Sequence, residues 1–352
     1  MKIGLCGFAL SGKTTLFEAL TGLDFSQHYQ SSPTKFMEAI VEVEDKRLNF
    51  LSDVYLPQKH TPAVLELIDF AGIVPKEDKI NSYILSKMRN IDLIAIVLNH
   101  FSDTQNNLMD ELKIFLEELI FADMVVLTNR IEKLDTNLKK GKNLEQRLKD
   151  QKELEIISFV LSKLEQDKKV DLSSITTDQH KILKCFQLFF LKPYIIIVNT
   201  TEANLHSTNQ NIHELLQFEP DTIKVCAILE KDFSKLDSKS QQDFIKDWGV
   251  DSLVKEKIIN LAYKKGGLIS FFTVGKDECK AWTIMKGSTA FEAAGKIHSD
   301  IQRGFIRAEV VSYDDFYRYK SMKELKAHGL HRLEGKDYIV QDGDIILFRF
   351  NV

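Results

Sequence analysis

The feature that most constrains this chain is a phosphate-loop motif within its first fifteen residues. An apolar run over residues 2–6 leads into Gly7-Phe-Ala-Leu-Ser-Gly12-Lys13-Thr14, which has the spacing G-x-x-x-x-G-K-T, and a helix-like run follows it. The glycines let the loop turn its backbone N–H groups towards phosphate, while Lys13 supplies a cation and Thr14 supplies a hydroxyl for Mg²⁺. Taken alone, a Gly-Lys-Thr triplet is usually a surface turn. Between a strand and a helix, it predicts a nucleotide-binding α/β domain with a mainly parallel sheet.

A second part of the site is predicted where another apolar run ends in an acid. Residues 64–72 read Val-Leu-Glu-Leu-Ile-Asp69-Phe-Ala-Gly72, so D-x-x-G follows a strand-like segment. We expect Asp69 to hold Mg²⁺ through water and the Gly72 N–H to meet the γ-phosphate, which makes them, with Lys13, the predicted catalytic residues. Ile73 stands where many GTPases have a water-orienting Gln. Because an aliphatic side chain forms no hydrogen bond, another group must position the water, or turnover must be slow.

The base-recognition motif favours adenine over guanine. Guanine sites usually place Asn-Lys-x-Asp after a buried strand, whereas this chain has Asn199-Thr-Thr-Glu202 after residues 194–198. The Lys is absent and Glu is one methylene longer than Asp, and such a mismatch in hydrogen bonding shifts selectivity strongly. The segment Cys226-Ala227 ends the next strand-like run and is expected to begin the loop that closes over the base.

Hydrophobic periodicity divides the chain into three parts. Strand-like runs alternate with helical segments over residues 1–110 and 190–265, as in an α/β nucleotide-binding domain. Residues 111–189 carry apolar residues at helical spacing, which predicts an inserted α-helical coiled-coil hairpin with its tip at 139–143. Residues 266–352 alternate apolar and polar residues around one helix-like run at 289–301, which predicts an α+β module. Strands of the first domain are expected at 2–7, 39–43, 63–69, 93–98, 194–199 and 222–228, and those of the module at 268–273, 281–284, 305–311, 338–340 and 345–350.

Composition argues against several other classes of protein. The chain has 47 Lys and Arg against 51 Asp and Glu, so its net charge of −4 makes no global case for nucleic-acid binding. Its four cysteines include no C-x-x-C pair, which argues against a disulfide framework or a cysteine zinc site and fits a reducing cytosol. The most apolar stretch, residues 186–198, is interrupted by Lys192 and Pro193, so no membrane span is expected. We therefore expect a cytoplasmic protein.

The predicted hairpin carries local positive charge. Residues 130–153 contain eight Lys and Arg and five Asp and Glu, which gives 8 − 5 = +3. A solvated coiled coil is the simpler interpretation of such a run, and a basic arm that contacts RNA or another acidic partner is the alternative.

With these motifs in this order, the chain resembles the Obg-like ATPase family, also called YchF. The shared order is phosphate loop, D-x-A-G, helical insertion, N-x-x-E, C-A-x-L-E and a C-terminal TGS domain. The most specific segments are residues 271–275, 281–284, 293–298, 304–310 and 333–344. The resemblance covers essentially the whole chain and implies a G domain split by a coiled coil and followed by a β-grasp-like TGS domain. It also implies ATP preferred over GTP, Mg²⁺ as cofactor, and association with ribosomes or translation factors.

The resemblance also assigns site residues by position. The phosphates would be lined by Leu10, Ser11, Gly12, Lys13, Thr14 and Thr15; the base by Asn199, Thr200, Glu202, Cys226 and Ala227; and the metal would be held by Thr14, Thr34 and Asp69. Thr34 is the candidate switch threonine because it precedes Val41-Glu-Val-Glu-Asp45-Lys-Arg47-Leu48, the counterpart of the family's V-x-V-P-D-x-R-L segment.

Two departures from the family pattern concern turnover. Leu10 stands where the family's loop, Gly-Leu-Pro-Asn-Val-Gly-Lys-Ser, has an Asn whose oxygen could help to bind K⁺. After Val74 the family has a glycine-rich segment, G-A-x-x-G-x-G-L-G-N, whereas residues 75–81 read Pro-Lys-Glu-Asp-Lys-Ile-Asn. Glycines let a switch reorganise around a γ-phosphate at low steric cost, so their loss predicts a stiffer or altered switch. The chain therefore resembles a divergent paralogue more than a standard member of the family.

Three functions remain open from the sequence. The leading hypothesis is a monomeric switch that binds ATP with Mg²⁺, binds GTP less well, hydrolyses ATP slowly and contacts the ribosome or its RNA, with no DNA or membrane partner. The second is a catalytically degenerate nucleotide-binding or RNA-binding adaptor. The third is a true GTPase, which Glu202 makes less favourable.

Overall fold

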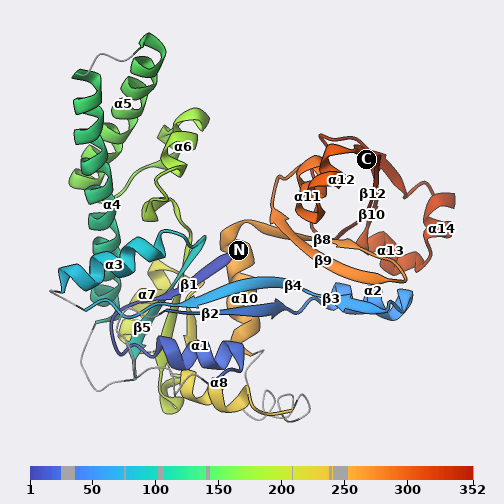
Figure 1. Cartoon of the computed structure of the whole chain (residues 1–352). Helices are drawn as coiled ribbons and strands as arrows, with labels where there is room; N and C mark the ends of the chain where they lie inside the picture. The colour runs from blue at the N-terminus through green and yellow to red at the C-terminus, as the bar shows by residue number, and fades with distance from the viewer. Residues whose placement is uncertain are drawn as a thin grey trace. The chain divides into compact units, whose positions relative to one another are not determined.

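The computed structural model describes residues 1–24, 36–74, 77–101, 107–139, 143–207, 209–237, 240 and 253–351 (Figure 1). The chain folds into two compact units. The first unit comprises residues 1–39 and 67–254, and the second unit comprises residues 40–66 and 255–352. The expected α/β class, with a mainly parallel sheet, a helical insertion and a C-terminal α+β module, is confirmed. The three domain boundaries expected from periodicity stay a prediction.

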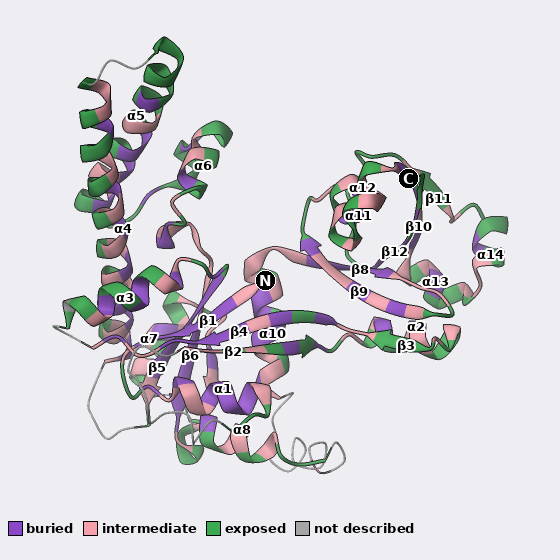
Figure 2. Ribbon diagram, in the orientation of Figure 1, coloured by how far each residue is buried: buried purple, intermediate pink, exposed green. Residues whose placement is uncertain are grey.

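The first unit is organised around a sheet with the strand order β2-β4-β1-β5-β6-β7. Its strands are β1 (Lys2–Cys6), β2 (Met37–Val43), β4 (Ala63–Asp69), β5 (Leu93–His100), β6 (Tyr194–Thr200) and β7 (Ile223–Val225). β5 pairs in parallel with β1 and with β6, and β6 pairs in parallel with β7. The central strands are buried almost throughout (Figure 2), as expected for parallel strands covered on both faces. β7 is shorter than predicted because α8 (Ala227–Phe233) begins inside the expected strand.

Helices cover both faces of this sheet. One core cluster joins β5 and β6 to α3 (Asp78–Met88), the start of α4 (Leu108–Lys139) and α7 (Gln210–Phe218). α1 (Lys13–Thr21) and α8 pack against each other on the other side (Figure 1). The remaining short elements are η1 (Leu172–Ser174), α6 (Thr177–Lys184), η2 (Phe189–Leu191) and η3 (Glu202–Asn204).

The predicted helical hairpin is present in the first unit. α4 packs along α5 (Leu144–Asp167), and their shared core contains Leu127, Leu134, Ile157 and Leu164 (Figure 1). Asn143 caps α5 by accepting a hydrogen bond from the Gln146 N–H at 2.9 Å. The rest of the predicted tip, residues 140–142, lies outside the described residues. None of the described helices is both long and apolar enough to cross a membrane.

The second unit contains a mixed sheet with the strand order β11-β10-β12-β8-β9-β3. Its strands are β3 (Lys59–Thr61), β8 (Leu268–Thr273), β9 (Glu278–Met285), β10 (Phe305–Ser312), β11 (Arg332–Glu334) and β12 (Asp344–Phe350). Its helices are α2 (Lys46–Tyr55), α10 (Val254–Gly266, which begins at the boundary), α11 (Ala290–Ile297), α12 (Ser299–Arg303), α13 (Tyr313–Tyr319) and α14 (Met322–Ala327). The core beneath α11 includes Phe271, Ala294 and Phe348.

Two local predictions for the second unit are wrong. Residues 289–301 form two helices instead of one, because His298 has an extended backbone (φ −163°) and caps α12 through its side chain. Residues 338–340 form no strand, and Ile339 makes only an isolated bridge with Thr289.

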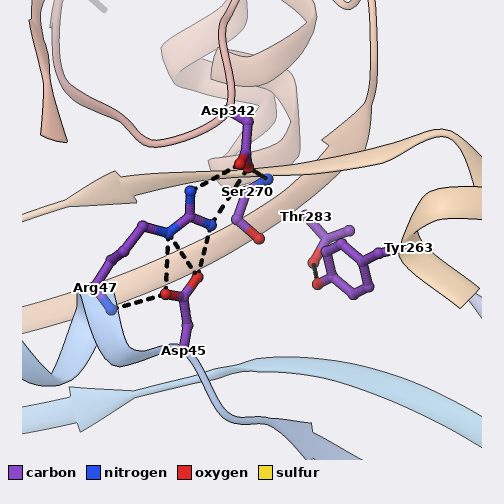
Figure 3. Close-up of polar contacts among 6 residues, drawn as sticks. All are labelled: Asp45, Arg47, Tyr263, Ser270, Thr283 and Asp342. Carbon is purple, nitrogen blue, oxygen red and sulfur yellow. Dashed lines mark hydrogen bonds and ion pairs between the residues drawn. The ribbon is translucent and has the colours of Figure 1, made fainter. Parts of the chain in front are cut away.

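Part of the second unit comes from the N-terminal third of the chain. β3 pairs in parallel with β9, which makes it the edge strand of the second sheet. On α2, the Tyr55 ring stacks on Phe316 with centroids 5.5 Å apart, and Arg47 belongs to a polar cluster with residues of this unit (Figure 3). Within residues 40–66, α2 and β3 therefore fold with residues 255–352, while the ends of this segment belong to β2 and β4.

Candidate nucleotide-binding site

The phosphate loop joins β1 to α1, and its glycines are required by close contacts. Gly7 has φ +146°, and a Cβ placed on it would lie 2.5 Å from the Val97 carbonyl oxygen. Gly12 has φ +85°, and a Cβ there would lie 2.0 Å from Asn199 Nδ2. Both positions exclude a side chain, because the loop packs closely against Val97 and Asn199. A helix N-terminus that begins at Lys13 presents backbone N–H groups to an anion.

Lys13 is held inside the loop. Its side chain is 5% exposed, and Nζ donates hydrogen bonds to the Phe8 carbonyl oxygen at 2.6 Å and to Ser11 Oγ at 3.2 Å. Burial lowers the pKa of Lys13, and the negative charge of Asp69 partly opposes that effect. A phosphate group would offer this buried ammonium a full opposite charge instead of neutral dipoles, so the position is suited to anion binding.

Thr14 and Asp69 meet directly. The Thr14 hydroxyl donates a hydrogen bond to Asp69 Oδ2 at 2.6 Å, although 55 residues separate them. Asp69 is 4% exposed and stands at the end of β4, which the sheet order places beside β1. A hydroxyl and a carboxylate are hard oxygen donors, the type that Mg²⁺ prefers. The predicted metal pair is therefore assembled at the phosphate loop.

The segment after Asp69 lies against the phosphate loop. The Ala9 N–H donates to the Ile73 carbonyl oxygen and the Ile73 N–H donates to the Gly7 carbonyl oxygen, both at 3.0 Å. A Cβ on Gly72 would lie 2.4 Å from Ala9 Cα, so only glycine fits there. The Ile73 side chain is 1% exposed and belongs to the core cluster. Its contribution to the site is therefore limited to its main chain.

Asn199 joins the end of β6 to both the phosphate loop and α8. Its Nδ2 donates to the Ser11 carbonyl oxygen at 3.1 Å, and its Oδ1 accepts from the Ala227 N–H at 3.0 Å. The structure thus brings the predicted Asn199, Ser11 and Ala227 together. Asn199 is 4% exposed, so this linkage is made away from solvent.

The other predicted site residues fall into three groups. Ser11 and Cys226 are buried, Gly12, Thr14 and Thr15 are half-buried, and Leu10 and Glu202 are exposed. Thr200 is buried, and its hydroxyl donates to the His100 carbonyl oxygen at 3.5 Å, towards β5. The candidate switch residue Thr34 lies outside the described residues. The metal role predicted for it stays a prediction.

Two polar side chains near the site, the half-buried Glu111 and the buried Asn81, were not among the predicted residues. Glu111, in the first turn of α4, accepts a hydrogen bond from the Asn99 N–H at 3.3 Å and interacts electrostatically with Lys13. Burial raises the pKa of Glu111, and the hydrogen bond from Asn99 opposes the shift. Asn81, in the first turn of α3, bonds to Val74 beyond the D-x-x-G segment. Neither position carries a motif, and only the fold brings them close to the loop.

Comparison with known proteins assigns the chain to a family. Residues 2–130 match the family described as "50S ribosome-binding GTPase", and residues 268–351 match the C-terminal YchF GTPase family, described as "Protein of unknown function (DUF933)". Two proteins named "Ribosome-binding ATPase YchF" are similar along their whole length: that of Mycoplasma genitalium at 34% identity and that of Bacillus subtilis at 35%, with 100% of each chain covered. The chain belongs to the YchF family.

A solved YchF structure supports the same assignment. The structure of the Schizosaccharomyces pombe YchF GTPase matches with a TM-score of 0.84 at 26% identity and covers 99% of this chain and 97% of that one. The resemblance stated from the motifs is thus confirmed. Within the YchF fold, Lys13, Thr14 and Asp69 lie together at the phosphate loop.

Proposed function

We propose that this YchF protein binds ATP with Mg²⁺, hydrolyses it slowly and acts as a nucleotide-dependent switch that associates with ribosomes. The observation that carries the nucleotide part is the 2.6 Å contact between Thr14 and Asp69 beside the buried Lys13. The names of the relatives, "Ribosome-binding ATPase YchF", support ATP as the nucleotide and the ribosome as the partner. Work at the ribosome implies a cytoplasmic protein, and we propose that it acts as a monomer.

The chemistry of the site supports Mg²⁺ as the metal. Thr14 would hold it directly and Asp69 through water, with Thr34 as a further ligand. When bound there, Mg²⁺ would supply positive charge at the phosphates of the nucleotide. Lys13 contributes a fixed positive charge to the same phosphates, and Gly72 contributes a main-chain N–H. Asn199 donates a hydrogen bond to the Ser11 carbonyl oxygen in the loop that carries Lys13.

The nucleotide choice and the slow rate rest on two residues. Glu202 follows β6 where a guanine site has Asp, and the Lys of the guanine motif is absent, which favours adenine. Ile73 occupies the water-orienting position, and its side chain is buried in the core. Without a hydrogen-bonding group at that position, orientation of the attacking water loses its usual contribution.

The decisive experiment measures binding and turnover side by side. Calorimetry with Mg²⁺ should give a higher affinity for ATP than for GTP, and Lys13→Ala should weaken ATP binding by at least about 100-fold, or about 2.7 kcal/mol. ATP hydrolysis should be slow in the wild type and absent in Lys13→Ala. Ribosome co-sedimentation should differ between the ATP and ADP states. No ATP binding at millimolar nucleotide would overturn the proposal.

A catalytically degenerate adaptor is the second candidate, favoured by the burial of Ile73. Hydrolysis equal to that of Lys13→Ala, together with unchanged ribosome binding, would support it. A true GTPase would show the reverse order of affinities in a competition between ATP and GTP.

A further inference from the structure

The main chain that follows Asp69 is held by hydrogen bonds from two sides, and on one side they come from a single buried side chain. On the first side, Ile73 pairs through its N–H and its carbonyl with Gly7 and Ala9 of the phosphate loop. On the other side, the Asn81 carboxamide pairs with both main-chain groups of Val74. The Val74 N–H donates to Asn81 Oδ1 at 3.1 Å, and Asn81 Nδ2 donates to the Val74 carbonyl oxygen at 2.8 Å.

This second contact is built into the interior. Asn81 is 6% exposed and lies one turn into α3, and its own N–H donates to the Glu77 carbonyl oxygen at 3.0 Å. The carboxamide therefore satisfies the Val74 N–H and carbonyl oxygen with one acceptor and one donor, as the main chain of a neighbouring strand would. Since a buried polar group is costly when left without a partner, Asn81 and Val74 depend on each other.

Gly72 is the residue whose orientation these contacts determine. It lies between Asp69, bonded to Thr14, and the pair Ile73-Val74, bonded to the loop and to Asn81. With both flanks fixed, the peptide planes around Gly72 have little freedom. A group that is already oriented needs no reorganisation when charge develops near it.

We propose that Asn81 is a positioning residue for ATP hydrolysis, which holds the main chain at Gly72 in the orientation that meets the γ-phosphate. The inference rests on the proposed function, because it needs a nucleotide at the phosphate loop. Asn81 touches neither nucleotide nor metal, and it acts through Val74. Residues 75–81 lack the family's glycines, and the contact between Asn81 and Val74 is a physical reason why Gly72 still keeps its orientation.

The test compares Asn81→Ala and Asn81→Asp with Ser82→Ala, an exposed neighbour on the same helix. ADP contains no γ-phosphate, so ADP affinity reports the integrity of the loop. Single-turnover hydrolysis reports positioning. We expect Asn81→Ala to lose at least about tenfold in rate, about 1.4 kcal/mol, while its ADP affinity stays within about threefold of wild type. Ser82→Ala should match the wild type in both.

Asn81→Asp tests whether both hydrogen bonds to Val74 are needed for the rate. The carboxylate keeps an acceptor for the Val74 N–H but repels the Val74 carbonyl oxygen, so the rate should fall at about pH 8. At about pH 5.5 a buried carboxyl takes up a proton and can donate again, so the rate relative to wild type at the same pH should recover.

The outcomes separate the two proposals. A wild-type rate in Asn81→Ala, or an equal loss of rate and ADP affinity, would overturn the positioning role and leave the proposed function standing. Failure of the wild type to bind ATP and ADP would overturn both. Loss of rate with retained ADP affinity and recovery of Asn81→Asp at low pH would support the inference.

Discussion

Arg47 and Asp342 lie 295 residues apart in sequence, and Arg47 Nη1 lies 2.8 Å from Asp342 Oδ2 (Figure 3). The same guanidinium contacts both oxygens of Asp45, and Asp342 Oδ1 also accepts the Ser270 N–H at 2.9 Å. Burial lowers the pKa of Arg47, but the two carboxylates outweigh it and hold the pKa above its ordinary value. One arginine therefore joins α2 to β8 and to the turn before β12 within the second unit.

A double-mutant cycle should measure this link. Because Arg47 is shared by two carboxylates and partly buried, Arg47→Ala and Asp342→Ala should be coupled by about 1–2 kcal/mol in the free energy of unfolding. Chemical denaturation gives the four values. The exposed pair Lys149–Glu145, one turn apart on α5, is the control and should couple by less than about 0.5 kcal/mol. Equal coupling in the two cycles would contradict this role for Arg47.

The linkage through Asn199 predicts a specific loss of nucleotide affinity. Asn199→Ala removes the hydrogen bonds to Ser11 and Ala227, so the loop and α8 are no longer held together, and ATP affinity should fall about tenfold. Asn199→Asp keeps the acceptor for Ala227 but loses the donor to Ser11. It also sets a buried carboxylate against the Ser11 carbonyl oxygen, so calorimetry should give an ATP affinity no higher than that of Asn199→Ala. If Asn199→Ala bound ATP as tightly as wild type, the linkage would be irrelevant to binding.

Lys13 predicts how ATP affinity depends on pH. Burial lowers its pKa in the nucleotide-free protein, and bound phosphate favours the charged form, so affinity is greatest while Lys13 is protonated. Affinity should fall as the pH rises through that lowered value, below the ordinary 10.5. Titrations from about pH 7 to about pH 10 test this, with Lys13→Arg as a control that stays charged. Parallel pH profiles for the two proteins would contradict the assignment.

Glu111 predicts a stability effect of the opposite sign from most carboxylates. Burial raises the pKa of Glu111 in the folded protein above its ordinary value of 4.5. Below that ordinary value the carboxyl is neutral in both states and costs no stability. As the pH rises through the raised pKa, ionisation of the carboxyl lowers the free energy of unfolding. Glu111→Gln should therefore raise the melting temperature at neutral pH and change it little at about pH 4. Glu132→Gln, an exposed residue of the same helix, is the control. A lower melting temperature for Glu111→Gln at neutral pH would contradict the burial argument.

Leu10 combines two unfavourable features in the phosphate loop. It has φ +64° and is 87% exposed, so its side chain gains little from packing. Leu10→Asn should stabilise the fold by up to about 1 kcal/mol, because Asn tolerates the left-handed conformation better. It also places an oxygen where the family's Asn stands, so hydrolysis by the variant should respond to K⁺ while the wild type does not. A K⁺ response of equal size in both proteins would show that Leu10 is not the reason.

Local pattern is enough to predict much of this protein. The phosphate loop carries a spacing motif, the long strands β5 and β6 carry apolar runs, and the α4–α5 hairpin carries a helical period. β3 carries none: its three residues, Lys59–Thr61, are polar and largely exposed, and they form a strand only because they pair with β9. A strand of this kind depends on a partner more than 200 residues away, which no local pattern contains.

The candidate site shows the same division. Lys13, Thr14 and Asp69 are predictable because phosphate and metal chemistry require those residue types at known spacings. Asn81 and Glu111 are ordinary residues in the first turns of two helices. Their positions near the loop arise from how α3 and α4 pack on the sheet, so the structure alone identifies them.

The interleaving of the two units has a consequence for synthesis. Residues 40–66 leave the ribosome early, but their partners in the second unit lie in residues 255–352, which are made last. Until then Phe50 and Tyr55 of α2 lack the rings of Tyr313 and Phe316, on which they pack in the folded protein. A nascent chain or a truncation that ends before residue 255 therefore exposes aromatic surface from its own N-terminal third, and such surface promotes aggregation. A truncation that removes residues 255–352 therefore leaves α2 and β3 of the second unit without their folding partners.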